Sequence, residues 1–163
     1  MRSCLALTLV FFVACGSDDQ IAREDLVPRD RTPVAAPPVE LTGVEHEIRM
    51  AGSVEEGFRF DPPEITVRAG DTVRWINTTG FPHNVAFYMD SVPRGAGTVL
   101  DGLMPAEGKL GPMIGRIMSQ MGESFKIDFV NVPAGRYRYF SVPQEARGMV
   151  GTLIVEAQPV PGS

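Results

Sequence analysis

Cysteine is almost absent from this chain, which has two cysteines in 163 residues, at positions 4 and 15. Both precede the part of the sequence that has the alternating patterns of a folded domain. A disulfide inside that domain is therefore excluded, and so is any metal site there that needs a thiolate ligand.

Long apolar runs are also missing. The run from Leu5 to Val13 is shorter than the roughly 20 residues of a membrane-spanning helix. Because it follows Arg2 and ends in Phe12-Val13-Ala14-Cys15-Gly16, it predicts a lipoprotein signal peptide over residues 1–14, with Cys15 acylated. An ordinary signal peptide cut nearby is the alternative. We expect an exported protein, held by its lipid on a bacterial membrane and facing the periplasm or cell surface.

Basic charge is scarce as well. The chain has 15 Lys and Arg against 20 Asp and Glu, a net charge of −5. An acidic protein repels phosphates, so nucleic-acid binding is excluded, and membrane attachment would come from the lipid. The sequence leaves a protein partner possible without naming one, and it does not decide the oligomeric state.

Short β-type runs separated by turn residues fill the chain from residue 44 to residue 157. Residues 15–43 contain the proline-rich stretch from Thr32 to Val39 and predict a linker, and residues 158–163 predict a tail. The runs are residues 46–50, 58–60, 64–68, 72–77, 84–88, 124–130, 136–141 and 149–156. They predict an all-β sandwich of two sheets.

One stretch, residues 91–122, breaks the β pattern. After Pro112 it has apolar residues at helical spacing, which predict a short amphipathic helix; they are Met113, Ile114, Ile117, Met118 and Met121. Two roles are open for the methionines of residues 104–121, which are Met104, Met113, Met118 and Met121. Packing against the sandwich is favoured, and a Cu(I)-thioether patch is the alternative.

Two further segments resemble sequence motifs of a known protein family. They are Asn77-Thr-Thr-Gly-Phe-Pro-His83-Asn84-Val85 and Tyr139-Phe-Ser141-Val-Pro143-Gln144-Glu-Ala-Arg-Gly148-Met149-Val-Gly151. With the strands before them, they resemble the plastocyanin-like cupredoxins over about residues 44–156. The resemblance implies a Greek-key β-sandwich, copper binding and electron transfer outside the cytoplasm. It also implies four ligand positions, which this chain fills with His83, Ser141, Gln144 and Met149.

Two of these four positions depart from the family pattern, because Ser141 stands where the family has cysteine and Gln144 where it has histidine. A blue-copper centre is a His₂Cys site with a weak axial methionine, and a neutral hydroxyl cannot replace its thiolate. An amide oxygen is likewise a weaker ligand than imidazole. We therefore predict a degenerate site with no cofactor, in which His83 only holds its loop. Residual copper binding, especially of Cu(I), by His83 and Met149 is the alternative.

The remaining chemistry-bearing residues indicate no catalytic site. His46, the other histidine, lies on the first predicted strand, where a surface role is favoured over a role as copper ligand. A hydrolase triad of Ser141, His83 and Glu145 would need an oxyanion hole and a nucleophile-elbow motif, and the sequence shows neither. The prediction is a binding or structural protein and not an enzyme.

Overall fold

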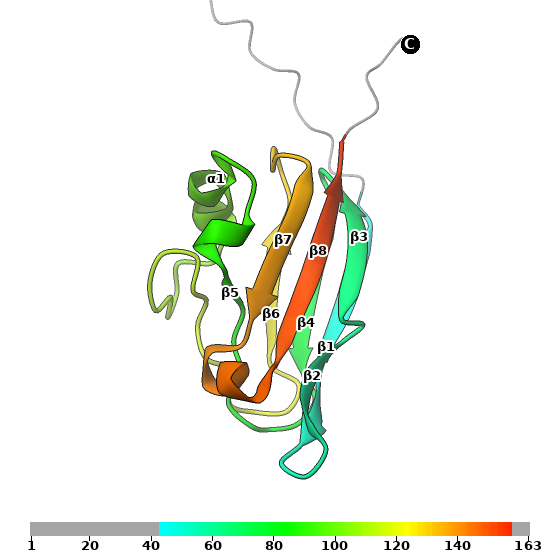
Figure 1. Ribbon diagram of the computed structural model, residues 1–163, viewed down its shortest axis with the longest axis vertical. Helices are drawn as coiled ribbons and strands as arrows, with labels where there is room; N and C mark the ends of the chain where they lie inside the picture. Colours follow the sequence, from blue (N-terminus) through cyan, green and yellow to red (C-terminus); the bar gives the residue numbers. More distant parts are fainter. Residues whose placement is uncertain (1–42, 158–163) are drawn as a thin grey trace, which may run out of the picture. The chain divides into compact units, whose positions relative to one another are not determined.

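The computed structural model describes residues 43–157, so the predicted signal peptide, most of the linker and the tail lie outside the described part. In residues 43–157, eight strands form two four-stranded sheets, which confirms the predicted all-β sandwich (Figure 1). The strands are β1 (Glu45–Ser53), β2 (Gly57–Asp61), β3 (Glu64–Arg68), β4 (Thr72–Asn77), β5 (Ala86–Phe87), β6 (Ser124–Asp128), β7 (Gly135–Phe140) and β8 (Val150–Glu156). The helical elements are η1 (Met89–Ser91), α1 (Ala96–Leu103) and η2 (Val142–Arg147).

Each sheet combines parallel and antiparallel pairs. One sheet has the order β2-β1-β4-β6, with β1 parallel to β4, and the other has the order β3-β8-β7-β5, with β3 parallel to β8. Strands β2 and β3 follow each other closely in the chain but belong to different sheets, because Pro62 and Pro63 separate them. A proline has no N–H to donate to a ladder, so the pairing changes partner there.

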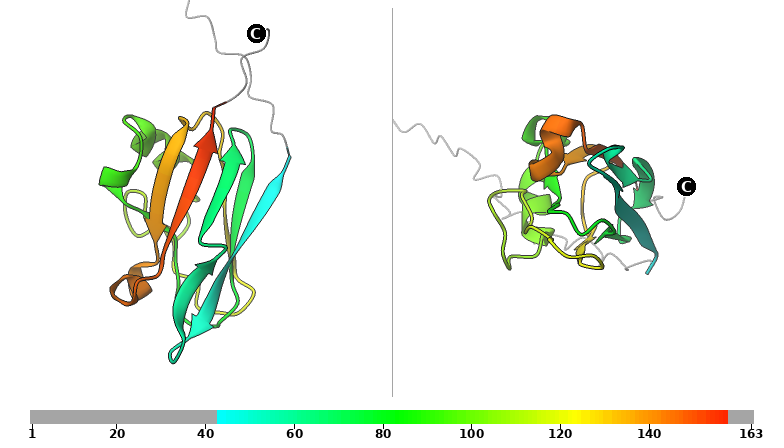
Figure 2. Two further views of the ribbon diagram at one scale, coloured as in Figure 1. Left: turned by 45° about the vertical axis from the view of Figure 1, so that its right-hand side comes forward. Right: turned by 90° about the horizontal axis from the view of Figure 1, so that it is seen from below.

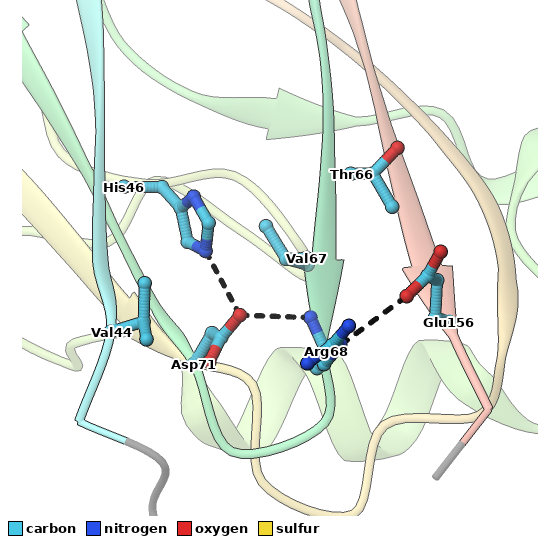
Figure 3. A pocket seen from close by; sticks show the side chains of 7 residues that line it. All are labelled: Val44, His46, Thr66, Val67, Arg68, Asp71 and Glu156. Carbon is cyan, nitrogen blue, oxygen red and sulfur yellow. Dashed lines mark hydrogen bonds and ion pairs between the residues drawn. The ribbon is translucent and has the colours of Figure 1, made fainter. Parts of the chain in front are cut away.

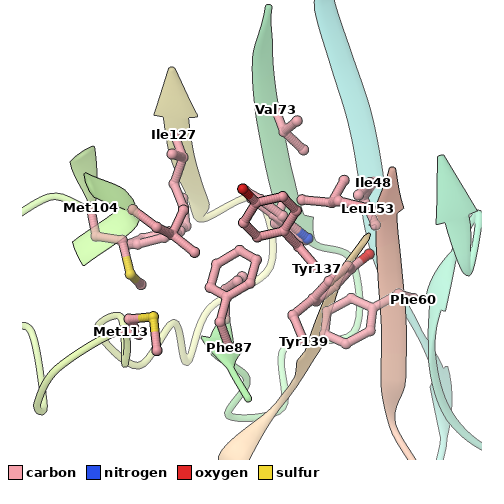
Figure 4. Packing of buried hydrophobic residues seen from close by; sticks show 14 of the residues in the cluster. Ile48, Phe60, Val73, Phe87, Met104, Met113, Ile127, Tyr137, Tyr139 and Leu153 are labelled. Carbon is pink, nitrogen blue, oxygen red and sulfur yellow. The ribbon is translucent and has the colours of Figure 1, made fainter. Parts of the chain in front are cut away.

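The core lies between the sheets and follows the period-two pattern of the strands. Val73, Trp75 and Asn77 alternate with more exposed residues along β4 and are all buried, and so are Tyr137 and Tyr139 of β7. Aromatic rings form its centre, where Tyr139 lies 4.7 Å from Phe60 and 5.6 Å from Trp75 between ring centroids (Figure 4). Edge-to-face packing of this kind adds roughly 0.5–1.5 kcal/mol per pair to the burial of the rings.

The two ends of the sandwich differ in what they carry. The chain enters β1 and leaves β8 at one end, whereas η2 lies at the other (Figures 1 and 2). The loop after β4 joins η2 at that second end, because β4 and β7 both run toward it. The two segments that carry the resemblance are thus brought together by the strand directions.

The predicted helix after Pro112 is wrong in position. The helix α1 spans Ala96–Leu103 instead. Neither it nor any other helix of residues 43–157 is long and apolar enough to cross a membrane. Met113 has a φ of 55°, outside the helical region, and so cannot continue a helix. Residues 114–118 run beside residues 83–86, where Met118 pairs with His83 and Ile114 pairs with Ala86.

Candidate metal centre

The loop after β4 is organised by one buried amide, that of Asn77. Its Oδ1 accepts hydrogen bonds from the N–H groups of Thr79 and Gly80 at 3.0 and 3.1 Å. Its Nδ2 donates to the carbonyls of Phe81 and Met118, at 2.7 and 3.2 Å. A side chain that hydrogen-bonds to four backbone groups holds a loop in one conformation without a helix or a strand. The Asn77 amide therefore fixes the backbone path that leads to His83.

His83 is fully buried, and its two ring nitrogens have different surroundings. Nε2 lies 2.9 Å from the hydroxyl of Thr79, whereas no group of residues 43–157 hydrogen-bonds to Nδ1. The edge of the Phe58 ring packs against the imidazole, with 5.1 Å between centroids. Burial lowers the pKa of His83 to about 4, because the imidazolium would lose its hydration, so the ring is neutral near pH 7.

Asn84, the next residue, connects the two segments. Its Oδ1 accepts the N–H of Val142 at 2.7 Å, and its own N–H donates to the hydroxyl oxygen of Ser141 at 3.3 Å. Its Nδ2 donates to the carbonyl of Gly115 at 3.1 Å. Because Asn84 and Ser141 are both fully buried, these bonds replace the water that the groups would otherwise need.

Gln144 is also tied on both sides. Its Oε1 accepts a hydrogen bond from the Arg147 guanidinium at 3.0 Å, and its Nε2 faces the carbonyl of Pro82 at 3.4 Å. The guanidinium lies 5.9 Å above the ring of Phe58, within the range of a cation–π contact. Arg147 therefore links Gln144 to the ring of Phe58, which itself packs against His83.

Met149 completes the group of four positions. It is fully buried, its N–H donates to the carbonyl of Gln144 at 3.3 Å, and its carbonyl accepts from Ser141 at 3.2 Å. Gly148 before it has a φ of 81°, a conformation that ends η2 and that glycine adopts without strain. The structure thus brings His83, Ser141, Gln144 and Met149 together, all buried, at the η2 end of the sandwich.

The donor set does not fit a type 1 copper ion. It offers one imidazole and one thioether, while the hydroxyl and the amide are weak donors already engaged in hydrogen bonds. Within residues 43–157, no three His, Cys, Asp or Glu side chains gather where they could hold a metal. The assignment of these four residues to the copper-ligand positions of the family remains a prediction from the sequence.

The residues of the proposed hydrolase triad do not contact one another as a triad would, and the methionines of residues 104–121 have other positions. The carboxylate of Glu145 accepts the hydroxyl of Tyr88 at 3.1 Å, and the Nε2 of His83 faces Thr79, so these contacts do not form a Ser-His-acid relay with Ser141. Met104, Met113 and Met118 pack in the core as predicted, whereas Met121 is 71 % exposed.

His46 lies near the end of the sandwich where the chain enters β1 and leaves β8 (Figure 3). Its Nε2 is 2.9 Å from Oδ2 of the buried Asp71, which also accepts the N–H of Arg68 at 2.9 Å. These residues line a cavity of about 380 Å³ between β1 and β3. His46 is therefore partly exposed and away from the candidate centre.

Sequence reasoning missed the contacts of Asn84, Arg147 and Met118. A signal for Asn84 existed, because it directly follows His83 in the segment that carries the resemblance. Arg147 lies three residues after Gln144 in the sequence, but its bond to Gln144 depends on the path of η2. The place of Met118 beside His83 depends on residues 114–118 running along residues 83–86, which no local pattern indicates.

This two-sheet sandwich is a cupredoxin-like domain. The family model of copper binding proteins, plastocyanin/azurin family, matches residues 47–156, and the chain belongs to this family. The plastocyanin of Synechococcus sp. is 38 % identical over 111 residues, which cover 68 % of this chain and 74 % of that one. The chloroplastic plastocyanin of Tetradesmus obliquus is 40 % identical over 97 residues, 60 % of this chain and 58 % of that one, so little more than half of that relative is matched.

A solved structure agrees in fold. A mutant plastocyanin of fern superposes with a TM-score of 0.53 at 26 % identity, covering 68 % of this chain and 100 % of that one.

The buried imidazole of His83 makes stability depend on pH. The pKa is about 4 in the folded state and about 6.5 when unfolded. Between these values the unfolded chain binds more protons, so stability falls as pH drops from 6.5 to 4, by about 3 kcal/mol in total. Urea unfolding of the wild type and of His83→Gln at pH 7 and pH 4.5 measures how much the free energy of unfolding of each protein falls with pH. An equal pH effect in both proteins would contradict the assignment to His83.

Proposed function

We propose that this chain is an exported lipoprotein whose cupredoxin-like domain has lost type 1 electron transfer and serves as a non-redox binding or structural module. The observation that carries the proposal is the state of Ser141 and Gln144. Both are buried, both are engaged by neighbouring groups, and neither supplies the thiolate or the second imidazole of a blue-copper site.

The contacts of Gln144 support the same proposal. Arg147 bridges from Gln144 to the face of Phe58, and Phe58 packs on His83. Side chains that hydrogen-bond to one another in this way hold their positions without a metal. A catalytic role is not part of the proposal, since the polar groups form no nucleophile and base pair.

A second candidate function is copper handling, with Cu(I) held by His83 and Met149. It is favoured by one observation, the buried Nδ1 of His83, which no group of residues 43–157 satisfies. An unpaired buried nitrogen costs free energy, and a ligand at that atom would remove the cost. Imidazole with a thioether is a donor pair that suits Cu(I) better than Cu(II).

The cellular part of the proposal comes from the N-terminal sequence. Export and the lipid on Cys15 would tether the domain to a bacterial membrane, and a protein partner would then meet it in the periplasm or at the cell surface. Labelled palmitate in growing cells tests the tether, since Cys15→Ser should abolish incorporation.

The visible spectrum tests the loss of redox function. We expect the purified protein, mixed with Cu(II), to show no intense absorption in the visible range, because a Cu–thiolate bond is required for it. An intense band would overturn the proposal. A competition assay with Cu(I) separates the two candidates: binding that His83→Ala removes would establish copper handling, and no binding would leave the structural module.

A further inference from the structure

A second pocket lies beside α1 and has methionines in its walls. It measures about 280 Å³ and is lined by Met89, Gly97, Thr98, Asp101, Pro112 and Met113. The residues come from η1, from α1 and from the turn after Pro112. None of them belongs to the candidate centre at the η2 end. The pocket therefore needs an explanation of its own.

The position of Met113 in this pocket is fixed by the conformation and the hydrogen bonds of its backbone. Its φ of 55° is uncommon for a residue with a side chain and costs roughly 1–3 kcal/mol, so surrounding contacts must impose it. The carboxylate of Asp101 accepts its N–H at 2.5 Å, and its carbonyl accepts the N–H of Phe87 at 3.0 Å. The sulfur comes close to α1 at Gly97, where a Cβ would be 3.7 Å from it.

Two more methionines belong to this part of the fold, one beside the pocket and one in its wall. Met104 directly follows α1 and is 4 % exposed, and in Figure 4 its sulfur end points toward that of Met113. Met89 lines the pocket and is 74 % exposed. Packing accounts for the two buried methionines. It does not account for Met89, which leaves most of its surface in water.

We propose that this pocket binds a soft monovalent cation, Cu(I), through the thioethers of Met89 and Met113, with Met104 as the third sulfur. Thioethers select soft ions, and they carry no charge that would attract Mg²⁺ or Ca²⁺. The one carboxylate of the pocket, Asp101, is paired with the Lys109 ammonium at 2.6 Å. The pocket is thus close to neutral, and softness rather than charge determines what it takes.

Titration of the full mature protein with Ag(I), a redox-stable substitute for Cu(I), tests the site, with ¹³C NMR of the methionine methyl groups as the readout. We expect the methyl signals of Met89 and Met113 to shift upon binding of one ion. Met89→Leu and Met113→Leu should each weaken binding by about tenfold or more, because few ligands remain. Met121→Leu, which removes an exposed methionine outside the pocket, should leave the affinity of this site unchanged.

Two comparisons make the result decisive. Met89→Leu changes an exposed side chain, so its effect does not depend on whether Met113→Leu folds. His83→Ala removes the second candidate function without touching this pocket, so shifts of the Met89 and Met113 methyl signals that survive it belong here. The proposal is overturned if Ag(I) leaves the methyl signals of Met89 and Met113 in place, or if Met89→Leu binds as tightly as the wild type.

Discussion

The double variant Ser141→Cys/Gln144→His is expected to bind Cu(II) with an intense visible absorption, which we expect the wild type to lack. It supplies the thiolate and the second imidazole, while His83 and Met149 are already present and buried. The Cu–thiolate bond is the source of this absorption, so its appearance reports directly on the rebuilt ligand set. Titration with Cu(II), followed in a visible spectrophotometer, measures it.

The surrounding structure supports this expectation. The backbone N–H of Asn84 donates to the side chain of residue 141, and it would donate to a cysteine sulfur in the same place. The Nδ1 of His83 has no hydrogen bond to lose within the part of the chain that the structure describes. Arg147 would lose its bond to Gln144, and its exposed side chain can turn into solvent.

Single variants serve as controls. Gln144→His alone has no thiolate and should stay colourless, and Ser141→Cys alone should bind Cu(II) more weakly because one imidazole is missing. Producing the chain from residue 16 onward removes Cys4 and Cys15, so the new thiol is the only one. A colourless double variant that folds normally would mean that the four positions lie too far apart to act together.

Asn84→Ala is expected to destabilise the folded protein by roughly 2–3 kcal/mol, because it leaves one buried and one part-buried backbone group without partners. The N–H of Val142 would lose its acceptor, and the carbonyl of Gly115 would lose its donor. Because these groups belong to different segments, the change would also loosen the candidate centre. Chemical unfolding followed by tryptophan fluorescence measures it, since Trp75 is the one tryptophan.

Gln120→Ala is the matched control, because it removes an amide that is exposed. We expect a change within about 0.5 kcal/mol for it. If Asn84→Ala fell in the same range, the bridge between the two segments would not contribute measurably to stability.

The strands could be predicted because alternation is a local signal. Phe125, Ile127 and Phe129 had to share a face, and all three are buried. The helix was misplaced because the apolar residues after Pro112 belong to an irregular segment, in which Ile114 and Met118 pair with residues 83–86 and Met121 is exposed. The real helix has the same kind of signal, with Ala96 and Leu100 four residues apart and buried.

The candidate site was predictable in its members and not in their contacts. His83, Ser141, Gln144 and Met149 follow from the order of motifs in the chain. Which nitrogen of His83 is left without a partner depends on the hydroxyl of Thr79, which the Asn77 turn brings to within 2.9 Å of Nε2. Such contacts join residues through a folded loop, and a linear pattern does not contain them.

The chain enters β1 and leaves β8 at the same end of the sandwich, away from η2. A fluorescent label or affinity tag joined directly before residue 43 or directly after residue 157 would therefore leave the η2 end free. Attachment to a sensor surface at one of these two positions would likewise leave the residues around His83 accessible to molecules in solution.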